Sequence, residues 1–291
     1  MWNSRIDKTV RTVMMAAFEN KQEDDAVAYE CLEYDVSAHI ATVTFNRPDR
    51  LNALNGALRS EIHSACDRIY QDDDVRAVIF TGKGRGFCAG ADLTGPRPEG
   101  EETPPQNERL DDLGWVGRLA SAIYQLGKPT IAVMNGVAAG AGMSIALACD
   151  LRIGSAVSRF KTVFAERGLS PDTGMSYFLP RLIGYGRAAD LIFTSREVRG
   201  EEAYRLGLLD RFVAEGEIMS CARDVASRMA SLPPMAIRSS KRVLQYNMDL
   251  DFQRALINES SGLQFARRSP NDQKEQRASF LEKRKANFTG T

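Results

Sequence analysis

The sequence predicts an α/β fold, because strand-like segments alternate with helical segments and are followed by a mostly helical tail. The predicted strands span residues 40–45, 75–81, 130–134, 151–155 and 210–213, and helical patterns between them span 58–69, 110–126 and 143–149. From Arg187 onward the pattern is mostly helical, and Pro233-Pro234 separates a helix at 218–232 from the next. Such an order is typical of an α/β domain whose tail packs on its own core or on a neighbouring chain.

Composition and charge exclude several classes of protein. The chain has 291 residues, of which 43% are apolar, enough for one large domain or two small ones. Its 38 Lys and Arg residues balance 38 Asp and Glu residues, so no overall positive field favours nucleic acid or an anionic membrane surface. We expect no membrane segment, because no apolar run in the sequence approaches the about 18 residues of a membrane span.

The spacing of cysteines and histidines argues against disulfides and metal sites. Five cysteines are scattered without CxxC spacing, which is typical of reduced thiols in a cytoplasmic protein. The two histidines form no HxxxH pattern, and no acidic loop has the spacing of a cation site. We therefore expect a cytoplasmic protein without a metal, in which His39 is a turn residue and His63 lies on a helix surface.

Residues 1–27 form a predicted N-terminal arm ahead of the first strand-like alternation. Apolar residues recur there with weak helical spacing, and a charged run follows at 21–25. The apolar run at 13–18 is too short for the hydrophobic region of a signal peptide. An accessory helix or arm is therefore expected.

A glycine-rich segment from Gly82 to Leu93 follows the second predicted strand. Such a loop can cradle phosphate, but this one lacks the GxxxxGK[ST] pattern and its GxGxxG-like spacing does not open into a helix. A P-loop is therefore rejected, and a dinucleotide-binding fold is not expected. Residues 94–107 are rich in Pro, Gly and Glu and predict a mobile surface loop over the site.

The stretch from Met134 to Asp150 is the strongest candidate for a functional site. A buried strand ends at Met134, and Gly140-Ala141-Gly142 allows the backbone to approach a ligand closely before a helix begins. That helix is apolar on all sides, so it is expected to be buried, with its unpaired N–H groups directed at the site. The alternative is a tight strand-to-helix crossover that only packs.

Five motifs in order make the chain resemble the crotonase superfamily of enoyl-CoA hydratases and isomerases. They are NRPDRLNAL (46–54), GRGFCAGADL (84–93), MNGVAAGAGMSIALACD (134–150), GLSPDTGMSYFLPRLIG (168–184) and FLEKRKANFTG (280–290). The resemblance runs from Tyr29 to the C-terminus. It implies a crotonase-like spiral of repeated ββα units at 28–215 that binds acyl-CoA. A C-terminal helical region at 216–291 would provide oligomer and coenzyme A contacts, in a homotrimer or a dimer of trimers.

The resemblance also assigns site residues. The backbone N–H groups of Ala91 and Ala141 would stabilise the enolate that forms when a proton is removed alpha to a thioester. The residues expected to contact the acyl-CoA are Leu51, Ala53, Ala89, Gly90, Asp92, Leu93, Gly140, Ser144, Phe164, Phe280 and Lys283. Among them, Phe280 and Lys283 match residues that reach the adenine and phosphates of coenzyme A, often from a neighbouring subunit. The alternative for Lys283 is a solvated helix face.

The acidic residues differ from those of hydratases in this family. Those enzymes hold water between two glutamates, and Ser144 and Phe164 occupy the corresponding positions here. Glu166 is the only nearby substitute. Asp172 matches the position of one catalytic acid in several isomerases of the family, and its alternative role is to cap the helix predicted through 175–179.

These matches predict an acyl-CoA double-bond isomerase of the Δ3,Δ2-enoyl-CoA type, or one for a related ring acyl-CoA, with Asp172 as proton carrier. No cofactor is expected, because coenzyme A is part of the substrate. An enoyl-CoA hydratase of fatty-acid or aromatic-acid degradation, using Asp172 or Glu166, is the alternative enzyme. A non-catalytic acyl-CoA-binding member of the fold is the alternative of another class, and the balanced charge argues against an RNA-associated member.

Overall fold

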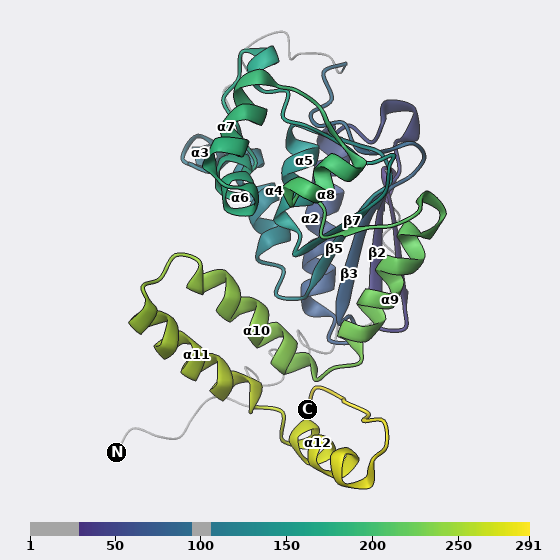
Figure 1. Cartoon of the computed structure of the whole chain (residues 1–291), viewed down its shortest axis with the longest axis vertical. Helices are drawn as coiled ribbons and strands as arrows, with labels where there is room; N and C mark the ends of the chain where they lie inside the picture. Colours follow the sequence, from purple (N-terminus) through teal and green to yellow (C-terminus); the bar gives the residue numbers. More distant parts are fainter. Residues whose placement is uncertain (1–28, 95–105) are drawn as a thin grey trace, which may run out of the picture.

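The computed structural model describes residues 29–94 and 106–291 (Figure 1). The predicted arm at 1–27 and residues 95–105 of the predicted loop at 94–107 lie outside these ranges. The described residues form two β-sheets with associated helices, followed by a helical C-terminal region.

Two sheets contain the strands of the described chain. The strands are β1 (Leu32–Ser37), β2 (Ile40–Phe45), β3 (Ala77–Gly82), β4 (Gly86–Cys88), β5 (Thr130–Met134), β6 (Val137–Ala139), β7 (Leu151–Gly154), β8 (Arg159–Lys161), β9 (Val198–Arg199) and β10 (Arg211–Phe212). The larger sheet has the order β1-β2-β3-β5-β7-β10, and the smaller has the order β4-β6-β8-β9. Only the pairs β1–β2 and β8–β9 are antiparallel.

Helices connect the strands and give the chain a spiral course. They are α2 (Gly56–Gln71), α3 (Gln106–Arg109), α4 (Gly114–Tyr124), α5 (Ala141–Ala148), α6 (Met175–Ile183), α7 (Tyr185–Thr194), α8 (Gly200–Leu206), α9 (Ile218–Ala230), α10 (Pro234–Asn247), α11 (Phe252–Ala266) and α12 (Pro270–Glu282), with 3-10 turns at Pro48–Arg50, Ala165–Arg167 and Glu215–Glu217. Two successive turns of the chain, β3-β4-α4 and β5-β6-α5, each add one strand to the larger sheet, one to the smaller sheet and then a helix. This is the expected spiral of ββα units, in which helical crossovers join parallel strands.

Alternate residues of the central strands face two hydrophobic cores. On β3, Val78 and Phe80 belong to the main core, which also contains residues of α2, α4 and α5. Ala77 and Ile79 belong to a second core, where they pack with residues of α9. Because such strands are buried on both faces, they need apolar residues at consecutive positions, which explains the continuous run AVIF.

Several elements differ from the sequence prediction. The short strands β4, β6, β8 and β9 lie where no strand is predicted, because two or three residues carry no readable alternation. The helix predicted at 110–126 spans Gly114–Tyr124 and follows the separate short helix α3. The loop predicted at 164–174 contains a 3-10 turn at Ala165–Arg167. His63, expected at the surface, is half-buried, and this burial lowers its pKa.

The expectations for His39 and for the cysteines are confirmed. His39 is exposed in a turn, with its Nδ1 atom 2.9 Å from the Asp74 carbonyl oxygen. All five cysteines are free thiols, and burial raises the pKa of Cys66, Cys88 and Cys149 to about 12, so these thiols are poor nucleophiles. Among the helices at 29–94 and 106–291, none is long and apolar enough to cross a membrane.

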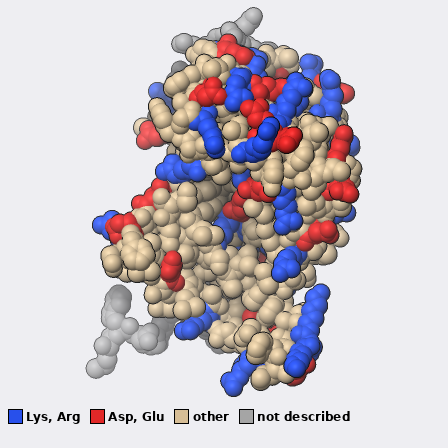
Figure 2. All heavy atoms as spheres, in the orientation of Figure 1, with Lys and Arg blue, Asp and Glu red and all other residues tan. Residues whose placement is uncertain are grey.

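The C-terminal helices extend away from the two sheets. Helices α10 and α11 lie side by side, and α12 lies beyond them near the C-terminus (Figure 1). Large apolar side chains of the α10–α11 pair are exposed in the single chain, among them Leu244, Phe252, Ile257 and Leu263. Charged side chains of both signs are intermingled on the face shown in Figure 2, in keeping with the balanced composition.

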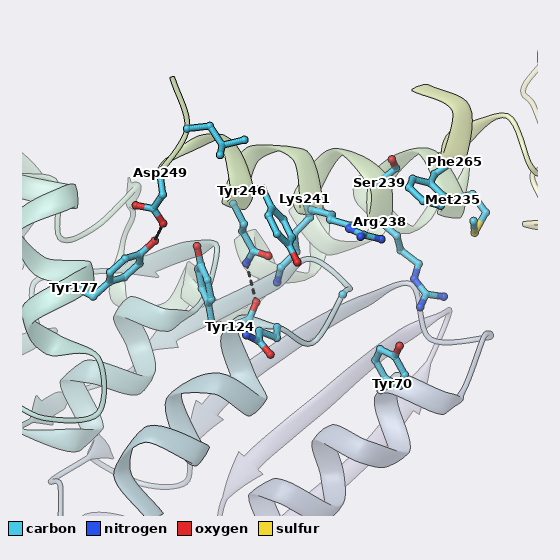
Figure 3. A pocket seen from close by; sticks show the side chains of 15 residues that line it. Tyr70, Tyr124, Tyr177, Met235, Arg238, Ser239, Lys241, Tyr246, Asp249 and Phe265 are labelled. Atoms are coloured by element: carbon cyan, nitrogen blue, oxygen red, sulfur yellow. Dashed lines mark hydrogen bonds between the residues drawn. The ribbon is translucent and has the colours of Figure 1, made fainter. Parts of the chain in front are cut away.

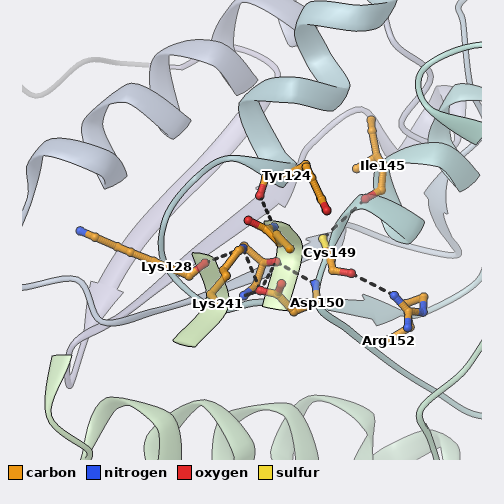
Figure 4. Close-up of polar contacts among 9 residues, drawn as sticks. Tyr124, Lys128, Ile145, Cys149, Asp150, Arg152 and Lys241 are labelled. Atoms are coloured by element: carbon orange, nitrogen blue, oxygen red, sulfur yellow. Dashed lines mark hydrogen bonds and ion pairs between the residues drawn. The ribbon is translucent and has the colours of Figure 1, made fainter. Parts of the chain in front are cut away.

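A partly buried ion pair attaches α10 to the segment that follows α5 (Figure 4). The Lys241 ammonium group donates to Asp150 Oδ2 at 2.8 Å and to the Lys128 carbonyl oxygen at 2.9 Å. The same Asp150 oxygen accepts from the Thr130 amide at 2.7 Å. One carboxylate therefore joins the start of β5, the segment that follows α5 and the C-terminal region.

We expect Lys241→Met to destabilise the fold by about 1.5–3 kcal/mol, the usual value of hydrogen bonds to a charged group. The methionine keeps the apolar stem but leaves the Asp150 carboxylate without its cation. The measurement is the urea midpoint at fixed protein concentration. Arg254→Met is the control, because the Arg254–Asp251 pair is exposed and its loss should cost less than about 1 kcal/mol. Equal midpoints for the two variants would contradict this attachment.

Candidate active site

The candidate site lies where the chain leaves two neighbouring strands of the smaller sheet. Strands β4 and β6 are parallel partners, with Gly86 paired to Val137 and Cys88 to Ala138. Their carboxyl ends therefore meet at the same edge of the sheet. Ala89-Gly90-Ala91 follow β4, and Gly140 follows β6 as the N-cap of α5.

Glycines allow the two chain segments to touch. A Cβ atom on Gly142 would lie 2.1 Å from the Cys88 carbonyl oxygen, and one on Gly90 would lie 2.7 Å from the Ala139 oxygen and 3.6 Å from the Ala141 nitrogen. Gly90 also has a φ of 89°, a conformation that favours glycine. The close backbone approach that the sequence predicts is therefore present, and it brings Gly90 next to the Ala141 N–H group.

The Ala91 and Ala141 N–H groups are both available to a ligand. Leu54 pairs with this segment through the Gly90 carbonyl and the Asp92 amide, so the Ala91 amide points to the other side. Ala141 is the first residue of α5 and has no partner within the helix. Neither amide donates to another residue of the described chain. Two such donors at adjacent strand ends can stabilise one oxyanion.

Asn52, which the sequence analysis did not single out, holds the loop beside the site. It is fully buried and donates to the Gly86 carbonyl at 2.7 Å and to the Lys83 carbonyl at 3.1 Å, while its Oδ1 atom accepts from the Arg47 amide at 2.8 Å. Its φ of 58° is left-handed, which asparagine tolerates better than most residues. The signal in the sequence that could have revealed this role was the asparagine between Leu51 and Ala53 in the motif at 46–54.

The predicted coenzyme A residues of the same loop pack against β4. The Leu51 carbonyl oxygen accepts from the Ala89 amide at 3.0 Å, and Ala53 is buried. Asp92 pairs with Arg47 at 2.8 Å and accepts from the Thr94 amide and hydroxyl. These bonds from Thr94 and Arg47 hold the pKa of the Asp92 carboxyl well below its usual range. The Asp92 side chain therefore connects the segment after β4 to the loop that contains Arg47.

Asp172 is half-buried in the loop before α6. Burial raises the pKa of its carboxyl above the usual value, and the hydrogen bond from the Thr173 hydroxyl, 2.9 Å long, partly opposes this rise. The N-cap of α6 is Gly174, and no side chain caps that helix end. The capping alternative for Asp172 is therefore wrong. Within the described residues, Asp172 has no basic partner in ion-pair distance.

The other candidate side chains differ from Asp172 in exposure and partners. Glu166 is exposed and pairs with Lys161 at 2.7 Å, so its carboxylate is directed to a surface cation. Phe164 is buried in the main core, and Ser144 is fully buried on α5. Neither Ser144 nor Phe164 therefore supplies a carboxylate to the site.

The predicted contacts from α12 are not brought to the site within one chain. Phe280 is exposed on α12, Lys283 is its C-cap residue, and this helix lies apart from α5 (Figure 1). Leu93, by contrast, is only two residues from Ala91 in the sequence, and its side chain is exposed. A role for Phe280 and Lys283 in a neighbouring subunit stays a prediction.

A separate cavity of about 850 Å³ lies between α10 and the ends of α2, α4 and α6 (Figure 3). Its lining includes Tyr70, Tyr124, Tyr177, Lys241 and Tyr246. None of Ala91, Ala141 and Asp172 lines this cavity. Among the residues that the structure describes, no group of three or more His, Cys, Asp or Glu side chains is placed to hold a metal ion.

Known proteins are similar to this chain in both sequence and fold. The Enoyl-CoA hydratase/isomerase family matches residues 35–291. A Short-chain-enoyl-CoA hydratase of Clostridium acetobutylicum is 37% identical over 247 residues, covering 84% of this chain and 92% of the relative. A 1,2-epoxyphenylacetyl-CoA isomerase of Escherichia coli is 32% identical over 277 residues, covering 88% and 97%.

A solved structure agrees with these matches. The enoyl-CoA hydratase of Bacillus anthracis superposes with a TM-score of 0.81 at 29% identity, and the match covers 90% of this chain and all of that one. The spiral of ββα units is thus the crotonase fold. The chain belongs to the enoyl-CoA hydratase/isomerase family of the crotonase superfamily.

Proposed function

We propose that the protein is an acyl-CoA double-bond isomerase, of the Δ3,Δ2-enoyl-CoA type or for a related ring acyl-CoA. The observation that carries this proposal is the half-buried Asp172, which has no ion-pair partner among the described residues. It is combined with Ser144 and Phe164 at the two positions that the family resemblance matches to the glutamates of hydratases. A single carboxylate can move a proton between two carbons, whereas hydration also needs a positioned and activated water.

In the proposed reaction, the thioester oxygen accepts from the Ala91 and Ala141 amides. Asp172 removes a proton from the alpha carbon, and the electron pair moves onto the carbonyl oxygen to form an enolate. The pair then returns through the shifted double bond, and the protonated Asp172 delivers the same proton to the gamma carbon. A carboxyl group whose pKa is raised by burial suits both the removal and the return.

The remaining parts of the proposal concern binding and assembly. Leu51, Ala53, Ala89 and Leu93 would contact the coenzyme A portion of the substrate, and no further cofactor is needed. The exposed apolar side chains of α10 and α11 support a homotrimer or a dimer of trimers, in which Phe280 and Lys283 would reach a neighbour's site. We place the enzyme in the cytoplasm.

An enoyl-CoA hydratase is the second candidate function. The names of several relatives favour it, including the Short-chain-enoyl-CoA hydratase of Clostridium acetobutylicum and a Crotonyl-CoA hydratase of Syntrophomonas wolfei. In this case Asp172 or Glu166 would activate water in an altered arrangement. A non-catalytic acyl-CoA-binding protein would bind these esters without converting either of them.

The expected activity separates these candidates. With 3-enoyl-CoA and 2-enoyl-CoA as substrates, isomerisation should exceed hydration by roughly 10²-fold or more, because a missing general base commonly costs this much. In deuterated water, any exchange of the carried proton should place label at the gamma carbon of the product. Faster hydration than isomerisation would favour the hydratase, and no turnover of either ester would favour the binding protein.

Replacing the proposed base tests its role directly. Asp172→Asn keeps the shape but removes the base, so turnover should fall by roughly 10²-fold or more while binding of the ester survives. Because the pKa of Asp172 is raised, kcat/KM of the parent should fall as the pH drops through a value above that of an ordinary aspartate. Glu166→Gln is the matched control and should keep both turnover and pH profile. Loss of turnover in Glu166→Gln, with parental turnover in Asp172→Asn, would identify Glu166 as the base instead.

Removal of one amide donor tests the oxyanion site. Ala141→Pro keeps the first helical position but deletes an N–H group that has no helical partner. Turnover should fall roughly 10²- to 10³-fold, since a lost oxyanion donor costs about 2.7–4 kcal/mol. A residue before proline usually has an extended ψ of about +120° to +160°. Gly140 has a ψ of −124°, close to the mirror image of that range, and glycine adopts mirror-image conformations about equally well, so it should tolerate a proline at position 141.

Tyr185→Pro is the control for this substitution. Tyr185 also opens a helix directly after a glycine with positive φ, and its side chain is exposed. Circular dichroism and ester affinity should stay near parental for both variants, and only Ala141→Pro should lose turnover. Parental turnover in a folded, ester-binding Ala141→Pro protein would show that the central stretch is only a packing crossover.

A further inference from the structure

We infer that Ser144 is a positioning residue, which holds the backbone of Asp172 in place relative to the Ala141 amide. This inference deepens the proposed function and rests on Asp172 being the base. Ser144 lies on α5, three residues after Ala141, so it belongs to the same rigid turn of helix as the proposed oxyanion donor. Its side chain is fully buried.

The Ser144 hydroxyl connects α5 directly to the Asp172 loop. Its Oγ atom lies 3.1 Å from the Asp172 carbonyl oxygen and 3.4 Å from the carbonyl oxygen of Gly140. A serine inside a helix ordinarily donates to the carbonyl four residues earlier, here Gly140. That carbonyl already accepts from the Ser144 amide at 3.0 Å. The shorter bond therefore crosses from the helix to the loop.

Both lone pairs of the Asp172 carbonyl oxygen are then occupied. The Met175 amide donates to it at 2.9 Å, and the Ser144 hydroxyl donates from the side of α5. The Asp172 carboxylate, in contrast, accepts only from Thr173 among the described residues. The residue thus has a fixed backbone and a side chain that is available for proton transfer.

The backbone next to these bonds is in a sparsely populated conformation. Thr173 has a φ of 51° and is followed by Gly174 with a φ of 80°. Val163 has a φ of 57°, and its Cγ2 atom would lie 3.0 Å from a Cβ atom on Gly140. Left-handed β-branched residues are uncommon and strained, so surrounding contacts must hold them. Ser144 supplies such a contact one residue before Thr173.

The two halves of the site belong to different segments of the chain. The amide of Ala141 belongs to α5, while Asp172 precedes α6. A displacement of about 1 Å between base and oxyanion donor can cost roughly 10²-fold in rate. One hydrogen bond between the two segments therefore has a larger effect on turnover than on stability.

Ser144→Ala tests this inference, with Ser239→Ala as the matched control. Ser239 is another buried serine whose hydroxyl donates to a carbonyl of a different segment, Gly262, at 2.7 Å, but it lies on α10. Ser144→Ala should remain folded by circular dichroism, because the Asp172 carbonyl keeps its bond from Met175. Ser239→Ala should also remain folded, since it too removes a single hydroxyl. We expect kcat for 3-enoyl-CoA to fall roughly 10- to 100-fold in Ser144→Ala with little change in KM, and to stay parental in Ser239→Ala.

A double-variant cycle distinguishes this inference from the proposed function. If Ser144 acts through the base, Ser144→Ala combined with Asp172→Asn should lose no more turnover than Asp172→Asn alone. If the turnover loss of the double variant equals the product of the two single losses, Ser144 acts independently of Asp172, and the inference is overturned. Parental kcat in Ser144→Ala would also overturn it. Parental turnover in Asp172→Asn would instead overturn the proposed function. If Ser144→Ala does not fold, Ser144→Cys, which keeps a weak donor of similar size, replaces it in the cycle.

Discussion

Direct backbone contact between the chain leaving β4 and the start of α5 constrains the rest of the site. A Cβ atom at Gly90 or Gly142 would lie well inside contact distance of a carbonyl oxygen on the facing segment. Any side chain at either position would separate the segments and with them the Ala91 and Ala141 amides. The buried Asn52 and the Arg47–Asp92 pair hold the flanking loop so that this approach is maintained.

The electrostatics of the site follow from which carboxylates have partners. Asp92 accepts from Thr94 and pairs with Arg47, and these bonds hold the pKa of its carboxyl well below its usual range. Glu166 pairs with Lys161 at the surface. Asp172 has only the Thr173 hydroxyl among the described residues, and burial raises its pKa. Such a carboxylate is a stronger base than a paired one and holds the proton that it takes up, which suits a group that must carry a proton from one carbon to another.

Overall similarity does not separate the two enzyme classes in this family. The hydratase of Clostridium acetobutylicum and the isomerase of Escherichia coli are 37% and 32% identical to the chain, and both matches cover most of its length. The fold and the pair of backbone amides suit any reaction that passes through an enolate. Our preference for isomerisation therefore depends on a few side chains, above all Ser144, Phe164 and Asp172.

The sequence by itself determined the spiral α/β fold, the family and the buried helix at 143–149, because ordered motifs and long apolar patterns are local signals. It did not reveal the short strands β4 and β6, since three residues carry no periodicity and form a strand only against their partners. Tertiary structure alone decided that Asn52 holds the loop, that Glu166 faces Lys161 and that Ser144 bonds to the Asp172 carbonyl. Each of these contacts depends on chain segments meeting in space, which residue spacing does not specify.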